Sequence, residues 1–576
     1  MKLLSPQALP YDFDEWRQQP FHIRAKMVCQ VWAVQGYGAP IAVYGFYLLK
    51  LIFFLWMWTW FASFPANLGN LSNISTWWYR PEALLKAMAW SMLFEGLGLS
   101  AGSGPLTARY NPPFGGFLYF LRPGTMKFSF RPGMPLVGGD TRRWFDCLLY
   151  LLHIVQLVRV LIAPEVTPGI LWPTAVLLPL LALTDRTMFL ASRPEHYLIG
   201  LICFLFPQDS LAAAKWVWYG IWFWAATSKL NHHFPSVISV MVSNSAVLRV
   251  PAIRRRLFRN FPEDLRASKL ATNAAHFGTV AEYLFPFLLM FGSLFLGRPA
   301  IIAGLIIMLG FHTFITSNVP MAVPIEWNFM MVYGGFLLFG HHSAVSPFAL
   351  HSPLLILLLF VALVIVPLVG NLYPDWVSFL LAMRFYAGNW AYSIWLFRDE
   401  AETKIAQHVK TTAPLLPQQL GLLYDAKTIE GILSRVISFR LMHLHGRILH
   451  DLLPQAVDDI DRYVWRDGEL VSGVVLGWNF GDGHLHNEYL LQSLQRRCQW
   501  ESGEVRVIFV DPQPIGRPYL AWRIFDAKDG KLAAGRTAVK DLIDRQPFPT
   551  EPLVYGQPMG TNITAIAPQT PVPASP

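Results

Sequence analysis

A series of long apolar segments is the feature that most constrains how this chain folds. The first runs from Ile41 to Phe64 and is interrupted by a single charged residue, Lys50. A helix needs about 20 apolar residues to cross the hydrocarbon core of a bilayer, so this run is long enough to span. Only 14% of the residues are charged, whereas soluble proteins carry about 25%. The sequence therefore predicts a polytopic integral membrane protein.

The fold class that we predict is mostly α, with a transmembrane helical bundle followed by a soluble α+β domain. An N-terminal segment covers residues 1–40, the bundle 41–397 with about 9–11 spans, the soluble domain 398–557, and a disordered tail 558–576. The expected spans are 41–64, 83–99, 145–163, 171–189, 196–206, 211–230, 274–295, 299–317, 325–339, 353–372 and 376–397.

Two parts of the predicted bundle depart from a plain apolar helix. Residues 101–143 are so rich in Gly and Pro that a continuous helix is excluded, and we expect a loop on the membrane surface that is partly re-entrant. The last candidate span, 376–397, carries Arg384 and Asn389. It either crosses the membrane or lies at the interface.

The C-terminal part has the composition of a globular domain. ILSRVISFRLMHL and HNEYLLQSLQRR have helical patterns, and VRVIFVD, YLAWRIFD and KLAAGRTAV have strand patterns. A turn at Lys528-Asp529-Gly530 joins the last two strands. We expect the region from about Thr411 to Gln557 to fold on its own.

Loop charges predict the orientation and bear on the partners. Arg and Lys are concentrated in the N-terminal segment and in the loop from Arg249 to Lys269. Because cytoplasmic loops are the basic ones, we expect a multi-pass protein of the inner (plasma) membrane with a cytoplasmic N-terminus. The side of the C-terminal domain depends on whether 376–397 spans. The same loops account for the net charge of +9, so membrane lipids, and no nucleic acid, are the expected partners.

The segment from Trp216 to Phe234 holds the densest group of polar residues at membrane depth. Aromatic residues including Trp224 precede Lys229, and His232 and His233 follow. If the helix continues, Lys229 and both histidines share one face. A lysine in apolar surroundings shifts toward the neutral amine and can act as a base; the alternative is an anchor at the lipid–water interface. No third ligand accompanies the two histidines, so no metal site is predicted.

Later spans add two ionisable residues to this group. Glu282 precedes Pro286 by one turn, and His312 lies in a hydrophobic helix. Ionisable side chains inside a membrane span are costly and mark functional sites by default. Three of them in successive spans favour a shared polar interior over three isolated, locally satisfied groups.

In their order these residues resemble the vitamin K-dependent gamma-carboxylase-like (horizontally transferred transmembrane domain) superfamily. The matching segments, within residues 140–340, are Ala226-Thr-Ser-Lys229-Leu230, Glu282-Tyr-Leu-Phe-Pro286, His312 and Trp327-Asn-Phe329. The resemblance implies Lys229, Glu282 and His312 as catalytic residues. We expect His232, His233, Trp224 and Trp327 around the substrate, and the resemblance implies a reduced quinone as the cofactor class. Ala226 replaces the usual Gly, and the C-terminal domain has no carboxylase signature, so carboxylation of glutamate is not expected.

Over its whole length the chain also resembles an uncharacterised family of actinobacterial transmembrane proteins, through NPPFGGFLYFLRPGTMKF and RFYAGNWAYSIWLFR. That resemblance implies no activity. Three functions stay open: an enzyme acting on a lipid or quinone-like substrate in a polar intramembrane cavity, a lipid-handling or transport protein without bond chemistry, and a scaffold that recruits a protein partner through the C-terminal domain.

Overall fold

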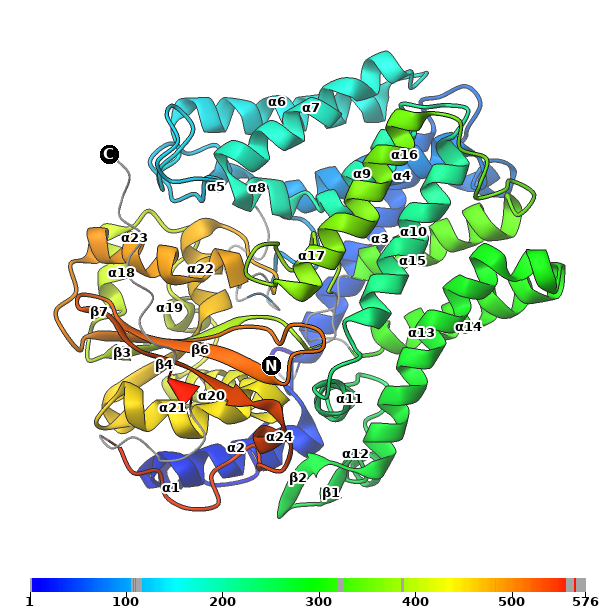
Figure 1. Cartoon of the computed structure of the whole chain (residues 1–576). Coiled ribbons are helices and arrows are strands. Elements are labelled where there is room, and N and C mark those ends of the chain that lie inside the picture. The colour runs from blue at the N-terminus through cyan, green and yellow to red at the C-terminus, as the bar shows by residue number, and fades with distance from the viewer. Residues whose placement is uncertain are drawn as a thin grey trace.

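The structure is a computed structural model that describes residues 3–104, 107, 109, 116–318, 325–384, 388–481, 483–555 and 564–565. Figure 1 shows a helical bundle in the upper and right-hand parts of the molecule and a sheet domain at the lower left. Most of the predicted tail, 558–576, lies outside the described residues.

The bundle contains most of the helices of the chain, and several of them are short. Its elements are α3 (Ile41–Ala62), α4 (Pro81–Gly96), α5 (Gly116–Phe120), α6 (Trp144–Ile162), α7 (Pro168–Thr184), α8 (Arg186–Ala191), η3 (Pro194–Leu198), α9 (Ile199–Cys203), α10 (Ser210–Thr227), α11 (Phe234–Val242), α13 (Lys269–Phe295), α14 (Arg298–Thr316), α15 (Ile325–Gly335), η4 (Phe336–His341), α16 (Pro353–Phe360), η5 (Val361–Ile365) and α17 (Val366–Leu372).

Five helical segments of the described chain are long and apolar enough to cross a membrane, fewer than the 9–11 predicted. They are Ile41–Ala62, Trp144–Ile162, Lys269–Gly292, Arg298–Thr316 and Pro353–Leu372. The difference arises because other apolar helices are short and surrounded by protein. In α4, for example, every residue from Ala83 to Gly96 is buried. Much of the apolar sequence therefore fills the protein interior instead of facing lipid.

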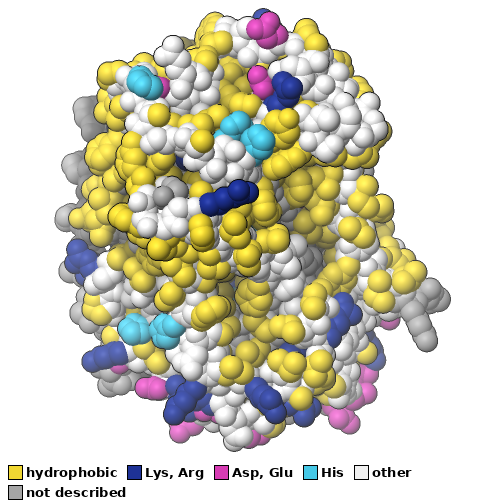
Figure 2. Space-filling view, turned by 90° about the vertical axis from the view of Figure 1, so that its right-hand side faces the viewer, with side chains coloured by type: hydrophobic (Ala, Val, Ile, Leu, Met, Phe, Trp, Pro, Cys, Tyr) yellow, Lys and Arg dark blue, Asp and Glu magenta, His cyan; other side chains and the backbone are white. Residues whose placement is uncertain are grey.

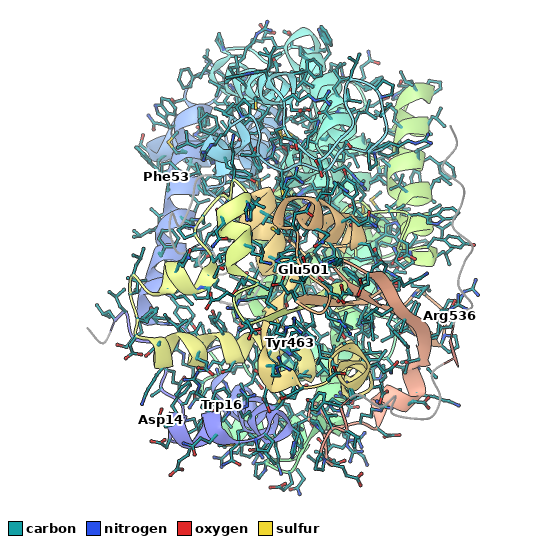
Figure 3. The ribbon with its side chains drawn as sticks, turned by 90° about the vertical axis from the view of Figure 1, so that its left-hand side faces the viewer. Asp14, Trp16, Phe53, Tyr463, Glu501 and Arg536 are labelled. Atoms are coloured by element: carbon teal, nitrogen blue, oxygen red, sulfur yellow. The ribbon has the colours of Figure 1, made fainter. Side chains whose placement is uncertain are left out.

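The long apolar helices form the perimeter of the bundle. Only 17% of the spanning part of α3 is buried, and Figure 3 shows Phe53 at the outer edge of this helix. On the side of the molecule where α13 and α14 lie, Figure 2 shows a broad hydrophobic surface with most charged side chains gathered at its lower end. This distribution fits a membrane-embedded upper part and a water-exposed lower part.

The C-terminal domain is built on a six-stranded antiparallel sheet in the order β4-β3-β5-β6-β7-β8. The strands are β3 (Tyr392–Arg398), β4 (Tyr463–Asp467), β5 (Val505–Val510), β6 (Tyr519–Asp526), β7 (Gly530–Ala538) and β8 (Thr564–Ala565). The helices around it are α18 (Thr403–His408), α19 (Leu416–Leu420), α20 (Ala426–Met442), α21 (Leu449–Ala456), α22 (Gly468–Leu476), α23 (Glu488–Cys498) and α24 (Val539–Ile543). The predicted helices and strands of this domain correspond to α20, α23, β5, β6 and β7.

The last candidate span, 376–397, is not a continuous helix, because its final part is a strand. β3 pairs with both β4 and β5 and occupies the interior of the sheet. Alternate side chains of a strand point to opposite faces: Trp395 and Phe397 enter the core shared with the bundle, and Ile394 and Leu396 enter the core on the other face. The sheet thus begins before the predicted boundary at residue 398. A strand that is buried on both faces reads as a continuous apolar run, which explains the misassignment.

The N-terminal segment and the basic loop pack against the sheet domain. Arg435 on α20 donates to the carbonyl of Tyr37 at 2.7 Å, just after α2 (Phe21–Gln35). Arg254 on α12 (Pro251–Arg255) donates to the carbonyl of Val34 at 2.7 Å. The hairpin of β1 (Phe258–Asn260) and β2 (Asp264–Ala267) lies beside them, and α1 (Phe13–Gln18) lies below the sheet domain in Figures 1 and 3. The N-terminal segment, the basic loop and the sheet domain therefore lie on one side of the bundle.

The Gly/Pro-rich segment 101–143 connects the bundle to the sheet domain. Buried Arg142 donates to Asp185 at 2.6 Å and to the carbonyl of Leu476 at 3.2 Å. Arg497 on α23 donates to both carboxylate oxygens of Asp140 at 2.9 Å. The described part of this segment is thus held between the bundle and the sheet domain, which differs from the loop on the membrane surface that its Gly and Pro content predicts.

The carboxylate of Asp140 makes this connection sensitive to acid. Burial raises the pKa of Asp140, but hydrogen bonds from Arg497 and Arg496 outweigh it and hold the pKa well below its ordinary value. Because the pKa of this acid is depressed in the folded state, the stabilisation is present above the ordinary pKa of about 3.9 and is lost as the pH falls further.

We predict that a fragment of residues 411–557 does not fold cooperatively, because it lacks β3, to which both β4 and β5 are hydrogen-bonded. A thermal transition followed by circular dichroism should be broad for this fragment and sharp for the full chain. A second fragment, 388–557, restores the strand and should resist proteolysis longer. A sharp transition of the 411–557 fragment would show that β3 is dispensable.

Candidate functional site

The structure brings Lys229 and Glu282 together as a buried ion pair. The Lys229 ammonium donates a hydrogen bond to Glu282 Oε2, and both side chains are 5% exposed. Two aromatic rings, Phe234 and Phe311, lie 5.5 and 5.7 Å from the ammonium nitrogen. The ring faces carry negative potential and favour the ammonium form. The residue predicted as a base and the predicted carboxylate thus form one unit.

The end of α10 sets the position of Lys229. The helix ends at Thr227, because the hydroxyls of Thr227 and Ser228 donate to the carbonyls of Phe223 and Ala225 at 2.7 and 2.9 Å, and such side chains compete with the helical ladder. The helix therefore does not continue through the two histidines, so the condition for a shared helical face of Lys229, His232 and His233 is not met. The side chain of His232 is exposed, and that of His233 is buried with its ring 5.5 Å from His445.

A cavity of about 310 Å³ adjoins this ion pair, and Lys229 lines it. We call it the Lys229 cavity. It lies between the loop after α10, the first turns of α13, the β1–β2 hairpin and the sheet domain. The lining residues are Lys229, Leu230, Asn231, His232, Phe234, Pro235, Ser236, Arg259, Arg266, Ala267, Thr272, Ala275, His276, Thr279, Leu444, Arg447 and Ile543. Four of them are Lys or Arg, two are His, and none is Asp or Glu.

Arg447, which belongs to the sheet domain, is the most deeply buried of the cations that line the Lys229 cavity. Its guanidinium donates to the carbonyls of Leu542 and Ile543 at 3.2 and 3.1 Å and to Ser236 Oγ at 3.3 Å, all neutral acceptors. Its Nε has no hydrogen-bond partner in the described part of the chain. Burial lowers the pKa of Arg447 to about 10, so the side chain stays charged at neutral pH. A buried cation without an acidic partner favours an anionic ligand.

His312 lies in the bundle interior next to this site but does not line the Lys229 cavity. Trp222 Nε1 donates to His312 Nε2 at 3.0 Å, and His312 Nδ1 lies 2.8 Å from Asn328 Oδ1. These distances assign the Nδ1–H tautomer, with Nε2 as an acceptor. Both ring nitrogens are thereby satisfied. The expectation that His312 shares the cavity with Lys229 does not match this geometry, although Phe311 beside it contacts the ammonium.

The two predicted tryptophans lie in different surroundings. Trp224 Nε1 donates to the carbonyl of Leu363 at 2.7 Å, so this ring fixes α10 against the η5 turn. The ring of Trp327 lies 6.4 Å from His312 and 5.7 Å from the guanidinium of Arg193. Neither tryptophan lines the Lys229 cavity.

Sequence reasoning missed most of the cavity. The sequence places Arg259 and Arg266 in a basic loop and does not indicate that they line a cavity. Arg447 belongs to the sheet domain, where a single Arg does not indicate a binding site. The available clue was the pattern Phe258 to Ala267, a short amphipathic stretch inside a basic loop. Contacts between segments about 200 residues apart in sequence cannot be read from local periodicity.

Residues 1–556 match the family described as "Transmembrane protein of unknown function (DUF3556)". No curated protein and no solved structure matches the chain. Because the match covers nearly the whole chain, the protein belongs to this family of transmembrane proteins.

We predict that Glu282→Gln lowers the thermal unfolding temperature of the purified full-length protein. The substitution leaves the Lys229 ammonium buried without its counter-charge, and breaking a buried pair costs about 3–5 kcal/mol. The double variant Lys229→Met/Glu282→Gln should recover most of the loss, because the uncompensated charge is gone.

The matched control is the exposed Lys528–Glu501 pair, whose side chains are 49% and 69% exposed. Lys528→Met and Glu501→Gln should change stability by less than about 1 kcal/mol. If Glu282→Gln unfolds at the temperature of the unmodified protein, the buried pair contributes nothing to stability.

Proposed function

We propose that this transmembrane protein binds an anionic amphiphile, a molecule with an acidic head group and a hydrocarbon part, in the Lys229 cavity. The observation that carries the proposal is the lining: it contains four Lys and Arg residues and no Asp or Glu, and Arg447 alone among these four has no ion pair with an acid in the described part of the chain. The volume of about 310 Å³ lies at the lower end of the range of small-molecule sites, about 300–1,000 Å³. It suits a head group with the first part of a chain.

The acidic head group is expected beside Arg447. Lys229 is already paired with Glu282, and Arg266 is held by Asp264, whose Oδ2 lies 2.6 Å from its Nη2. Among the described residues Arg447 has only neutral acceptors and an Nε–H without a hydrogen-bond partner. Arg259 is exposed at the rim of the cavity, 4.0 Å from Asp544. A carboxylate or phosphate can accept charge-assisted hydrogen bonds from such groups.

The hydrocarbon part is expected along α13. Ala275, Phe234 and Leu444 give the wall apolar surface, and Leu230 is 59% exposed where it lines the cavity. Phe277, next to the lining residue His276, is 77% exposed on the hydrophobic outer surface of the same helix. An amphiphile in the membrane therefore has an apolar route from the lipid-facing side of α13 to the cations.

A second candidate function is an enzyme that transfers a proton with the Lys229–Glu282 pair. The observation that favours it is the position of Lys229, which lines the cavity and touches Glu282 at the same time. The resemblance to the gamma-carboxylase-like superfamily, with a reduced quinone as its cofactor, agrees with proton chemistry at this lysine and stays a prediction. The roles inferred for His312, Trp224 and Trp327 have no support from the cavity.

We predict that the full-length protein in neutral nanodiscs binds fluorescent derivatives of oleate and lysophosphatidic acid, and that Arg447→Gln weakens the binding about 10- to 100-fold. The expected loss corresponds to about 1.5–3 kcal/mol for a hydrogen bond to a charged group. Arg259→Gln, at the rim, should weaken binding less. Comparison of the carboxylate with the phosphate probe identifies the head group.

Arg255→Gln is the matched control, since Arg255 is an exposed cation of the same basic loop that does not line the cavity. It should bind like the unmodified protein. The proposal fails if Arg447→Gln and Arg259→Gln bind both probes as tightly as the Arg255→Gln control. It also fails if a neutral monoacylglycerol probe binds as tightly as the anionic probes.

The proposed location is the inner (plasma) membrane, with the N-terminal segment in the cytoplasm. The charge of the basic loop supports this orientation, and its contacts with the sheet domain extend it to that domain. We predict that single cysteines at Arg256 and Glu501 in a cysteine-free background are protected from an impermeant thiol reagent in intact cells and labelled after permeabilisation. Labelling of either site in intact cells would contradict the orientation.

A further inference from the structure

A second group of buried charges lies inside the bundle, away from the Lys229 cavity. Its members are Lys50 on α3, Glu95 on α4, Arg193 and Glu195 at the start of η3, and Glu326 on α15. Each is at most 9% exposed. We call it the Glu95 cluster. Charged side chains at this depth are costly unless they are compensated, so the group needs an explanation of its own.

Arg193 connects two of the three carboxylates. Its Nε donates to Glu195 Oε1 at 2.7 Å, and its Nη1 lies 3.9 Å from Glu95 Oε1. Arg193 has a left-handed backbone, with φ 52°, and the π-helical turn η3 follows it. This local geometry brings the charged side chains at 193 and 195 together. Glu195 is therefore well compensated, whereas Glu95 receives a longer and weaker contact.

The turn after α4, which is rich in small residues, forms hydrogen bonds with two other members of the cluster, Lys50 and Glu326. The backbone N–H of Ala101 donates to Glu326 Oε1 at 2.8 Å. The carbonyls of Ser100 and Ser103 accept from the Lys50 ammonium at 2.8 and 2.9 Å. A Cβ on Gly102 would lie 3.8 Å from Glu95 Oε2. The turn thus lies against Lys50, Glu95 and Glu326.

The charges of the Glu95 cluster do not balance. Within the cluster three carboxylates face two cations, which leaves one negative charge if every group is ionised. Buried Arg109 acts on Lys50, but it donates to the carbonyl of Gly473 at 3.4 Å and forms no ion pair with the three carboxylates among the described residues. Buried polar atoms beside them also lack partners in the described chain: Glu195 Oε2, both ring nitrogens of His196, and the Tyr197 hydroxyl. A net charge in a low-dielectric interior is met by a bound counter-charge or by protonation.

We propose that the Glu95 cluster binds one proton and that Glu95 is the carboxyl that holds it. Arg193 holds Glu195 as a carboxylate, and the Ala101 N–H together with the Lys50 charge favours the ionised form of Glu326, because hydrogen bonds and opposite charges nearby stabilise a carboxylate. Glu95 has the weakest compensation of the three. A metal ion is the less suitable counter-charge, since the described residues contain no group of three His, Cys, Asp or Glu side chains able to hold one.

Protonation gives the bundle two charge states at membrane depth. With a proton on Glu95 the cluster is neutral, and after release of that proton to water its net charge is −1. The charged and titratable groups that interact with Glu95 from the surrounding elements are Lys50, Arg193, Glu195, Tyr197 and Glu326, and His196 interacts with Arg193. Trp327, whose ring lies 5.7 Å from the Arg193 guanidinium and 6.4 Å from the ring of His312, separates this cluster from the Lys229 side of the bundle.

The test compares the infrared absorption spectra of the unmodified full-length protein and its variants. The proteins are in nanodiscs at about pH 7, and each spectrum is recorded in H₂O and in D₂O. The unmodified protein should show the carbonyl band of a protonated carboxyl, shifted by D₂O, and Glu95→Gln should remove it. Glu82→Gln, in the first turn of the same helix, is the matched control and should leave the band unchanged. The proposal is overturned if Glu95→Gln removes only carboxylate absorption.

A second variant guards against misfolding of Glu95→Gln. Charge balance predicts that Glu326→Gln also removes the band, because two carboxylates then face two cations and Glu95 ionises. Persistence of the Glu95 band in Glu326→Gln would contradict the charge argument. A sodium arm separates proton from cation: if sodium, compared with N-methylglucamine, raises the unfolding temperature of the unmodified protein but not of Glu95→Gln, the counter-charge is a metal ion and the proton assignment is wrong.

Discussion

The burial of β3 on both of its faces is the constraint on which the rest of the structure depends. Trp395 and Phe397 pack into the core that continues into the bundle, and Ile394 and Leu396 pack toward α2, α11 and α20. One strand therefore joins the sheet domain to the bundle and to the N-terminal segment. This arrangement also places Arg447 and α24 against the start of α13, and the Lys229 cavity exists because those parts meet there.

The lysines of the bundle show how the chain treats charge at membrane depth. Lys50, Lys86 and Lys215 each donate to backbone carbonyls: those of Ser100 and Ser103, those of Val160, Leu161 and Ala163 at the end of α6, and those of His342 and Val345 after η4. Carbonyls at helix ends carry negative potential and suit a cation. Lys127 and Lys229 pair instead with the carboxylates of Asp146 and Glu282, and Lys229 in addition lines a cavity.

The sequence predicted the membrane character, the C-terminal sheet region and many helix positions, because apolar periodicity is a local property. α3, α6 and α14 begin and end within a few residues of the predicted spans. It misassigned β3, since a strand buried on both faces has the same apolar run as a membrane helix. It overestimated the number of spans because burial by protein and burial by lipid select the same side chains.

The candidate site was predictable only in part. The juxtaposition of Lys229 and Glu282 followed from the rule that ionisable residues inside spans meet one another. Arg447 and Arg259 could not be found in this way, because their contribution depends on contacts between the sheet domain, the hairpin and α13. Glu95 lies inside the predicted span 83–99, but its neighbours Arg193 and Glu326 come from segments that only the fold brings together.

The most direct measurement of the central claim is a density map determined by cryo-electron microscopy. The sample is the full-length protein, purified from its native membrane into nanodiscs. The account predicts elongated density in the Lys229 cavity, with its head group within hydrogen-bonding distance of Arg447 and its chain directed along α13. A cavity filled by protein side chains, or density held by the apolar wall without contact to Arg447 or Lys229, would contradict it.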